Sequence, residues 1–397
     1  MNNSVAVAGT LSSRKERKRN RRTLQIMLYP NIDNISVELK NFQKNFGPGD
    51  IEDFNQQFIE ILEDLRLDVQ EHGIDLRNRK ENDKYDYLTR LRKVGCAAFN
   101  KLFSREARQH LVELEGKEHD RGLRLTFITP PAFPLLWEML YTGTPLGKID
   151  PSQFWGLKYP LGRVYWDINH TDCLCLREGI ISVIHDKLEL SLKEVEHLEG
   201  YILRLCEVHS LKLTMQLLEK AIPFKTITSE ELITQFRGFC FGMVHFACHC
   251  DNPQNGGATQ ACLILTFHGL ELKLSLLDLL AYEDTGFINQ PFVFLNACES
   301  DTHGHLLQTI SFPNNMLRFG AGGVIATACT MPDNFASAFA AEFYRRLFEK
   351  LETNWSVNIG ETLLETRLHF FKEYNNPLGL AYGLYAVSDQ RLWLQEP

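Results

Sequence analysis

Two short segments of the chain contain a histidine and a cysteine that could react as a pair. VHFACHC, residues 244–250, is an apolar strand pattern that leads to His249, and FVFLNACES, residues 292–300, is a second one that leads to Cys298. If these strands are neighbours in a parallel sheet, their carboxyl ends lie about 5 Å apart at one edge. An imidazole that takes the proton of a thiol makes the sulfur a strong nucleophile, so the pair predicts cysteine hydrolase chemistry.

The first segment contains three further polar residues, His245, Cys248 and Cys250. Strand alternation places His245 and His249 on one face and Cys248 on the other. His245 lies two pleats before His249, where we expect either a packed histidine that supports the site or a residue of the substrate cleft. A zinc site of His245, Cys248, His249 and Cys250 is an alternative, but a continuous strand directs Cys248 away from the histidines. We expect no metal and no other cofactor.

The pattern around both segments predicts an α/β domain over residues 173–397. Strand patterns alternate there with helical ones and occur at residues 179–186, 242–249, 291–298 and 321–328. Ser191 with Glu194, and Thr228 with Glu231, are predicted capping boxes at the starts of two helices. The alternation indicates crossover connections and a mainly parallel sheet that is covered by helices on both faces.

Residues 23–172 have a different pattern and contain no pair of nucleophile and base. The expected elements are a strand at 23–30, helices within 54–65 and 85–111, a strand at 123–129 and a short helix or turn at 133–141. We predict a smaller, non-catalytic subdomain.

Composition limits the class of protein. The chain has 397 residues, of which 44% are hydrophobic and 23% charged, so it can bury sizeable cores. It has neither a membrane-spanning apolar run nor a signal-peptide pattern, so we expect a cytoplasmic protein with no membrane partner, whose ten cysteines are reduced. The net charge of -8 gives no reason to expect a nucleic-acid partner. The exception is the basic run at 14–22 in a predicted disordered arm, 1–22, which is either simply solvated or binds nucleic acid or an acidic partner.

The two segments resemble the CHAT family of caspase-like proteins, relatives of caspases and separases. His249 in FACHC precedes Cys298 in FLNACES by 49 positions (298 − 249), and caspases have a histidine about 50 residues before their nucleophile. AGGVIATA at 321–328 and GLAYGLYAVSD at 379–389 look typical of the family, and PLLWEMLY at 134–141 resembles its PWE element. The resemblance implies a caspase-like catalytic domain at 173–397 and a degenerate caspase-like subdomain at 23–172.

The resemblance also implies roles for individual residues. Cys298 would be the nucleophile and His249 the general base and acid, while the backbone N–H groups of Cys250 and Cys298 would form the oxyanion hole. The family usually has glycine at the position of Cys250. A side chain there stands where close substrate approach or a positive φ is wanted.

The function implied is that of a regulated endopeptidase. It would cleave a protein substrate in bacterial defence or programmed cell death and would be switched on by a separate activator or by self-association. The alternative is an inactive CHAT-like scaffold, in which Cys250 has spoiled the cleft and the basic arm carries the function.

Loop residues near the pair are candidates for the substrate cleft. Glu299 and Asp301 would favour a basic side chain before the scissile bond, or they are ordinary solvated acids. His303 and His305 would border the substrate, or they are exposed loop histidines. DNPQNGGATQ, residues 251–260, is either a mobile flap over the cleft or a plain surface connection.

Overall fold

The computed structural model describes most of the chain between residues 23 and 395. The described residues are 23–30, 35–39, 42–46, 48–79, 86–117, 123–129, 135–185, 188, 190–222, 225–251, 261–283, 286–299 and 311–395. For 23–30, 35–39, 42–46, 48, 110, 114–117, 297–299 and 311, only the backbone is described. The predicted basic arm, 1–22, lies outside this part of the chain.

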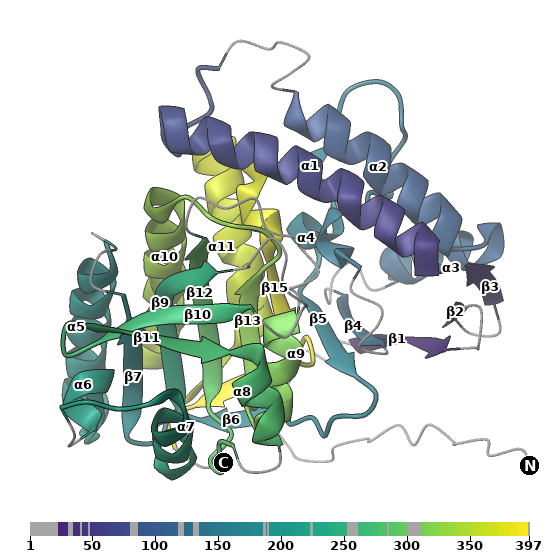
Figure 1. The fold of residues 1–397 in the computed structure, drawn as a ribbon. Coiled ribbons are helices and arrows are strands. Elements are labelled where there is room, and N and C mark those ends of the chain that lie inside the picture. Colours follow the sequence, from purple (N-terminus) through teal and green to yellow (C-terminus); the bar gives the residue numbers. More distant parts are fainter. Residues whose placement is uncertain are drawn as a thin grey trace, which may run out of the picture.

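The first part of the chain forms a sheet of order β3-β2-β1-β4-β5. Its strands are β1 (Thr23–Pro30), β2 (Ile35–Leu39), β3 (Phe42–Phe46), β4 (Arg124–Thr129) and β5 (Leu161–Tyr165). Its helical elements are α1 (Pro48–His72), α2 (Tyr87–Leu102), α3 (Arg105–Lys117), η2 (Trp137–Met139), η3 (Pro151–Gln153) and α4 (Trp155–Lys158). Figure 1 shows α1 reaching from this sheet towards the later part of the chain, where it contacts α10 and η6.

The second part forms a larger sheet, whose order is β8-β7-β9-β12-β13-β15, with the hairpin β10-β11 added beside β9. Its strands are β7 (Gly179–Ile184), β8 (Thr214–Leu217), β9 (Met243–Asp251), β10 (Cys262–Phe267), β11 (Leu270–Ser275), β12 (Phe292–Glu299), β13 (Gly323–Thr327) and β15 (Tyr382–Tyr385). The pairs from β8 to β13 are parallel, while β13 with β15, and β9 with β10, are antiparallel. The central strands are apolar on both sides, as buried parallel strands must be.

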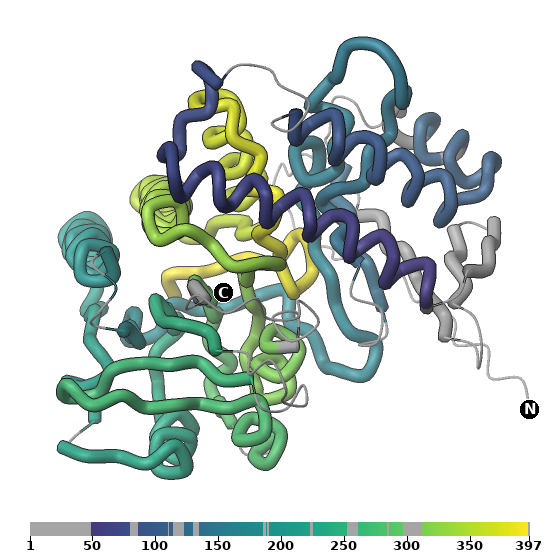
Figure 2. Tube along the Cα trace, turned by 45° about the horizontal axis from the view of Figure 1, so that its top comes forward, coloured from purple at the N-terminus to yellow at the C-terminus, as the bar shows by residue number. Residues whose placement is uncertain are grey.

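Helices cover both faces of the larger sheet (Figures 1 and 2). They are α5 (Ser191–His209), α6 (Leu218–Ala221), α7 (Ser229–Gly238), α8 (Leu276–Ala281), α9 (Ser311–Arg318), α10 (Asp333–Thr353), α11 (Ile359–Tyr374) and η6 (Pro377–Ala381). Phe294 of β12 faces the core that α5, α10 and α11 share. Val293 faces a second core, formed with α7, α8 and α9. A small third sheet, β14 (Ser356–Asn358), β16 (Arg391–Trp393) and β6 (Cys173–Cys175), completes the described fold.

The predicted class, an α/β fold whose mainly parallel sheet is covered by helices on both faces, is confirmed, with two local differences. The helical pattern at 85–111 is broken at Phe103 and Ser104 into α2 and α3. The capping box of Thr228 and Glu231 is present. The one predicted at Ser191 and Glu194 is wrong: the N-cap residue is Leu190, which makes no side-chain hydrogen bond, and Glu194 is turned into the interior.

The two sheets meet where β5 lies beside β15. A side chain at Gly162 would collide with the carbonyl oxygen of Ala386, so only glycine permits this approach. The hydroxyl groups of Thr126 and Ser388 are 2.9 Å apart. The larger hydrophobic core is continuous across the junction, from α1 to β15. This continuous core marks no boundary between two domains, so the predicted division between residues 172 and 173 stays a prediction.

A buried cluster of three charges also crosses the junction. Glu138 of η2 forms an ion pair with Arg163 of β5, and its other carboxylate oxygen lies 3.4 Å from Nη2 of Arg367 in α11. All three side chains are at most 6% exposed. Burial lowers the pKa of Arg367 to about 10, although the Glu138 carboxylate acts against this. One carboxylate thus compensates two buried guanidinium groups from the two parts of the chain.

In the described part of the chain, no helix combines the length and the apolar character that crossing a bilayer requires.

The Glu138 cluster makes a stability prediction. Glu138→Gln should lower the free energy of unfolding by about 3–5 kcal/mol, because removal of one partner leaves buried charge uncompensated. Glu52→Gln, at an exposed position on α1, serves as the control and should change it by less than about 0.5 kcal/mol. Urea denaturation measures both variants. Equal stabilities would mean that the cluster does not hold the junction.

Candidate active site

The pairing of β9 with β12 sets the geometry of the site. The two strands are parallel, and their register places Phe294 opposite His245, Asn296 opposite Ala247, and Cys298 opposite His249. Paired strands are about 4.8 Å apart. The two residues singled out from the sequence are therefore direct backbone neighbours at the carboxyl ends of adjacent parallel strands.

His249 lies at the point where the neighbour of β9 on the side away from β12 changes from β7 to β10. On that side β7 pairs with β9 only as far as Ile184 opposite Ala247, and β10 begins its pairing at Ile264 opposite His249. The backbone N–H of His185, just past the end of β7, donates to the carbonyl of Ala247 at 2.8 Å. On this side of β9, β10 therefore replaces β7 as the neighbouring strand at His249.

The imidazole of His249 is partly exposed. Its Nδ1 is buried and has no hydrogen-bond partner among the residues that the structure describes. The ring of His185 stands edge-on to that of His249, with centroids 4.7 Å apart. His185 is 3% exposed, so it forms a wall on one side of the His249 ring. An unpartnered nitrogen in this position is able to exchange a proton with a neighbouring group.

His245 lies beneath this site rather than in a cleft. It has no exposed surface, its Nε2 is 2.9 Å from Oε2 of Glu194 in α5, and its Nδ1 is 3.0 Å from the hydroxyl of Tyr344 in α10. Burial, with the nearby Glu194 carboxylate, raises the pKa of Tyr344, which keeps its O–H as a donor. The His245 ring can thus accept a hydrogen bond from the Tyr344 hydroxyl and donate one to the Glu194 carboxylate. This is the arrangement of a packed histidine that supports the site.

Asn296 extends the same network to β12. Its Nδ2 donates to Glu194 at 3.3 Å and to the carbonyl of Ala336 at 3.1 Å, and its Oδ1 accepts from the hydroxyl of Tyr382 at 2.9 Å. The Glu194 carboxylate therefore joins β9 and β12 directly below the pair of His249 and Cys298. Because each strand is fixed through a buried polar side chain, the register between them is fixed as well.

The two backbone donors predicted for an oxyanion hole point into the sheet in this conformation. The N–H of Phe292 donates to the carbonyl of Gly242, the residue directly before β9. Backbone groups alternate sides along a strand, so the even-numbered residues of β9 and β12, including Cys250 and Cys298, direct their N–H groups towards the partner strand. The pairing continues through Cys298 and Glu299. These N–H groups become available to a substrate only when the two strand ends separate.

The cysteines of β9 lie on the other face of the sheet from the histidines. Cys248 and Cys250 are buried in the second core, and burial raises the pKa of the Cys248 thiol far above its usual range. Cys250 occupies ordinary extended strand and does not adopt a positive φ. The four groups considered for zinc therefore do not converge, and the Cys250 side chain does not stand on the face of His249.

Several predicted residues cannot be placed at the site. Asp301, His303 and His305, as well as residues 252–260 of the predicted flap, lie outside the described residues, and so does the basic run at 14–22. For Glu299 the backbone alone is described, as the last residue of β12. Their roles stay predictions.

Sequence reasoning missed three residues of the site, His185, Glu194 and Tyr344. His185 had a usable signal, since it ends a predicted parallel strand at the same edge as His249. Glu194 fitted a capping motif equally well, and Tyr344 is one of many aromatic residues on an amphipathic helix. No local sequence signal distinguishes Glu194 or Tyr344 from the other residues of its helix.

Comparison of the sequence with known proteins found two similarities, one to a family model and one to a single protein. The model of the CHAT domain family matches residues 190–361. A probable protease of Vitiosangium sp. (strain GDMCC 1.1324) is 32% identical over 103 residues, which cover 26% of this chain and only 13% of that protein.

Two solved structures were also found to be similar. The Arg-specific cysteine proteinase gingipain R aligns over 94% of this chain and 79% of its own, with 13% identity and a TM-score of 0.43. Separase of Saccharomyces cerevisiae, in complex with securin, aligns over 86% of this chain and 23% of its own, with 13% identity and a TM-score of 0.39.

The sequence match covers both His249 and Cys298. The segment that contains them, residues 190–361, is similar to the CHAT domain family.

Proposed function

We propose that the protein is a cysteine endopeptidase in which Cys298 is the nucleophile and His249 the general base and acid. The observation that carries the proposal is the register that pairs Cys298 with His249 on adjacent parallel strands. Residues paired in register generally carry their side chains on one face of a sheet. The Nδ1 of His249 has no hydrogen-bond partner among the described residues, and this supports the same assignment, because the imidazole then has an atom with which to take the thiol proton.

The proposed reaction has two halves. His249 takes the proton of the Cys298 thiol, and the thiolate attacks the carbonyl carbon of the scissile peptide, whose C=O electron pair moves onto oxygen. The tetrahedral intermediate collapses as the C–N bond breaks and the His249 imidazolium protonates the leaving amine. A water molecule, deprotonated by His249, then attacks the thioester, and release of the acid returns the proton to sulfur.

The oxyanion hole of this mechanism needs a conformational step. The candidate donors, the N–H groups of Cys250 and Cys298, are directed into the pairing of β9 with β12, so the end of β12 must separate from β9 before they can hold an oxyanion. A protein of this kind is latent until something favours the separated state. This supports regulation by an activator, a separate molecule or a second copy of the chain.

A protein target and a role in bacterial defence or programmed cell death rest on family resemblance alone. Action in the cytoplasm is an expectation from the sequence pattern.

An inactive scaffold is the second candidate function, and it was based on Cys250 in place of glycine. The burial of the Cys250 side chain in the core on the opposite face weakens this argument, because the thiol occupies no space beside His249. The endopeptidase is therefore the better supported function.

Selective alkylation tests the pair. Iodoacetamide at neutral pH should modify Cys298 faster than Cys240, an exposed cysteine, because the imidazole of His249 stabilises the thiolate. His249→Ala should slow modification of Cys298 about tenfold or more. His197→Ala, at an exposed position on α5, is the matched control and should leave the rate unchanged. Peptide mapping by mass spectrometry reports each cysteine separately, and equal rates at Cys298 in both variants would contradict the assignment.

Cys250 provides a second test, which separates the two candidate functions. Cys250→Ala should leave the alkylation rate of Cys298 within about twofold of the original, since its side chain faces the core. Cys250→Gly should lower the free energy of unfolding by about 1–2 kcal/mol without raising that rate, because a glycine weakens a strand interior and leaves the core underfilled. A large gain in rate with glycine would show that the thiol obstructs the site and would favour the scaffold.

A further inference from the structure

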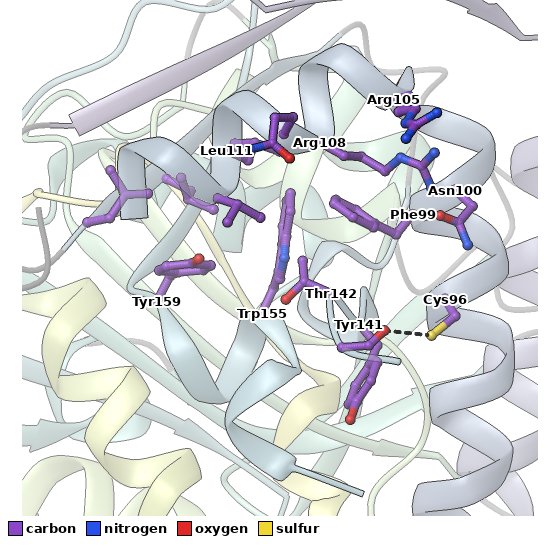
Figure 3. Close-up of a pocket in the computed structure, with 15 residues that line it drawn as sticks. Cys96, Phe99, Asn100, Arg105, Arg108, Leu111, Tyr141, Thr142, Trp155 and Tyr159 are labelled. Carbon is purple, nitrogen blue, oxygen red and sulfur yellow. Dashed lines mark hydrogen bonds between the residues drawn. The ribbon is translucent and has the colours of Figure 1, made fainter. Parts of the chain in front are cut away.

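A cavity of about 270 Å³ lies between α2, α3, β4 and α4 in the first part of the chain (Figure 3). All of its lining residues lie within 96–159, so none belongs to β9 or β12. Trp155, in the centre of Figure 3, is 1% exposed and stacks with Phe127, so it packs the core rather than offering a surface to a ligand. The cavity is therefore separate from the proposed active site, which His185 adjoins directly.

His185 approaches His249 from the side opposite to Cys298. The strands β7 and β12 flank β9 on its two sides. Cys298 of β12 pairs with His249, whereas His185 follows the last residue of β7, and its ring stands edge-on to the His249 ring with centroids 4.7 Å apart. The His249 imidazole thus lies between a neighbouring ring and the strand that carries the proposed nucleophile.

The backbone of His185 is held at both of its polar groups. Its N–H donates to the carbonyl of Ala247 at 2.8 Å, and its C=O accepts from the N–H of Leu188 at 3.1 Å. The hydroxyl of Ser191, 2.8 Å from the Leu188 carbonyl oxygen and 3.2 Å from that of His185, closes the same turn. Because the side chain is also only 3% exposed, His185 is a fixed support for the ring beside it.

The first turn of α5 serves the active-site strands rather than its own N-terminus. The Ser191 hydroxyl fastens the turn that begins at His185, and the Glu194 carboxylate accepts from His245 and Asn296. The serine and glutamate spacing that predicted a capping box therefore has another use here. One of its side chains supports the wall beside His249, and the other supports the strands below it.

The His249 ring requires a constraint of this kind. An imidazole at a strand end has several staggered rotamers, and only those directed towards β12 can take the proton of the Cys298 thiol. In many sites a hydrogen bond at the second ring nitrogen fixes the orientation. Nδ1 of His249 has no such partner among the described residues, so contact with the His185 ring supplies a constraint of a different type.

We propose that His185 is a positioning residue of the cysteine endopeptidase, whose ring excludes the rotamers of His249 that turn away from Cys298. The inference rests on the proposed function, because the orientation of His249 matters only if this residue acts on Cys298. His185 acts through ring contact and exchanges no proton in the reaction.

Three variants separate the ring of His185 from its polar atoms. His185→Phe keeps a flat ring without nitrogen, His185→Asn keeps a polar group near the position of Nδ1 without a ring, and His185→Ala removes both. Iodoacetamide alkylation of Cys298 at pH 7 in the full chain, measured relative to exposed Cys240 in the same sample, reports the state of the pair. We expect His185→Phe to stay within about twofold of the original rate, and His185→Asn and His185→Ala to be about tenfold slower, because a misdirected imidazole no longer stabilises the thiolate.

The pH dependence of the same reaction distinguishes positioning from general destabilisation. In His185→Ala the pH of half-maximal rate should rise by about one unit, which corresponds to the tenfold loss. Ile202→Val shortens a buried side chain of α5, about two turns beyond Glu194, and is the control. It should lower the melting temperature by about 2 °C and leave the pH profile unchanged.

The remaining outcomes overturn the positioning role. Full rate in His185→Asn with a slow His185→Phe would show that a polar atom of His185 matters and not its ring. All three variants at the original rate, or all three slowed alike, would equally remove the ring contact as the cause. If His185→Ala does not fold, the comparison of His185→Phe with His185→Asn still decides.

His249→Ala shows which of the two proposals has failed. If this variant alkylates at the original rate, the pair of His249 and Cys298 is wrong and the role of His185 falls with it. If His249→Ala is slow while His185→Asn and His185→Ala are not, the pair stands and only the positioning role is wrong.

Discussion

The parallel pairing of β9 with β12 is the constraint on which the candidate site depends. A slip of one residue would place Cys298 beside Cys248, whose side chain faces the opposite core, and would move every core residue of the strand to the wrong face. A slip of two would keep the faces but separate the pair by about 6.6 Å along the strands. Only one register brings the thiol-bearing and imidazole-bearing residues together.

The buried polar network below the pair is what distinguishes that register from the alternatives. Apolar packing alone tolerates a shift of two residues better than a hydrogen-bond network does, because a shift leaves buried donors and acceptors unpaired. Glu194 accepts from both His245 and Asn296, while Tyr344 and Tyr382 complete their hydrogen bonds. These contacts come from α5, α10 and β15, so the helices and the last strand act as a frame for two strand ends.

The sequence predicted the strands of the site well and their surroundings poorly. Period-two alternation and apolar runs identified β9 and β12, and the general behaviour of parallel sheets put their ends at one edge, because these signals are local. The role of Glu194 could not be found in this way, since a glutamate three residues after a serine fits a helix cap and a buried acceptor equally well. The direction of the Cys250 N–H depends on which strand lies on which side, which is a tertiary fact. The edge-on contact of His185 depends on where β7 stops.

The shared carboxylate of Glu138 joins parts of the chain that lie on both sides of the segment that matches the CHAT family, and one partner, Arg367, lies beyond its end. The recognisable family segment ends at residue 361, before Arg367, and before Tyr382, which holds Asn296 in place. It also begins after β7, the strand that flanks β9. A fragment cut to those limits would contain His249 and Cys298 but would lack β7, Glu138 and Tyr382, which support the strands that carry them. The segment that matches the family and the larger set of residues that supports β9 and β12 therefore have different boundaries in this molecule.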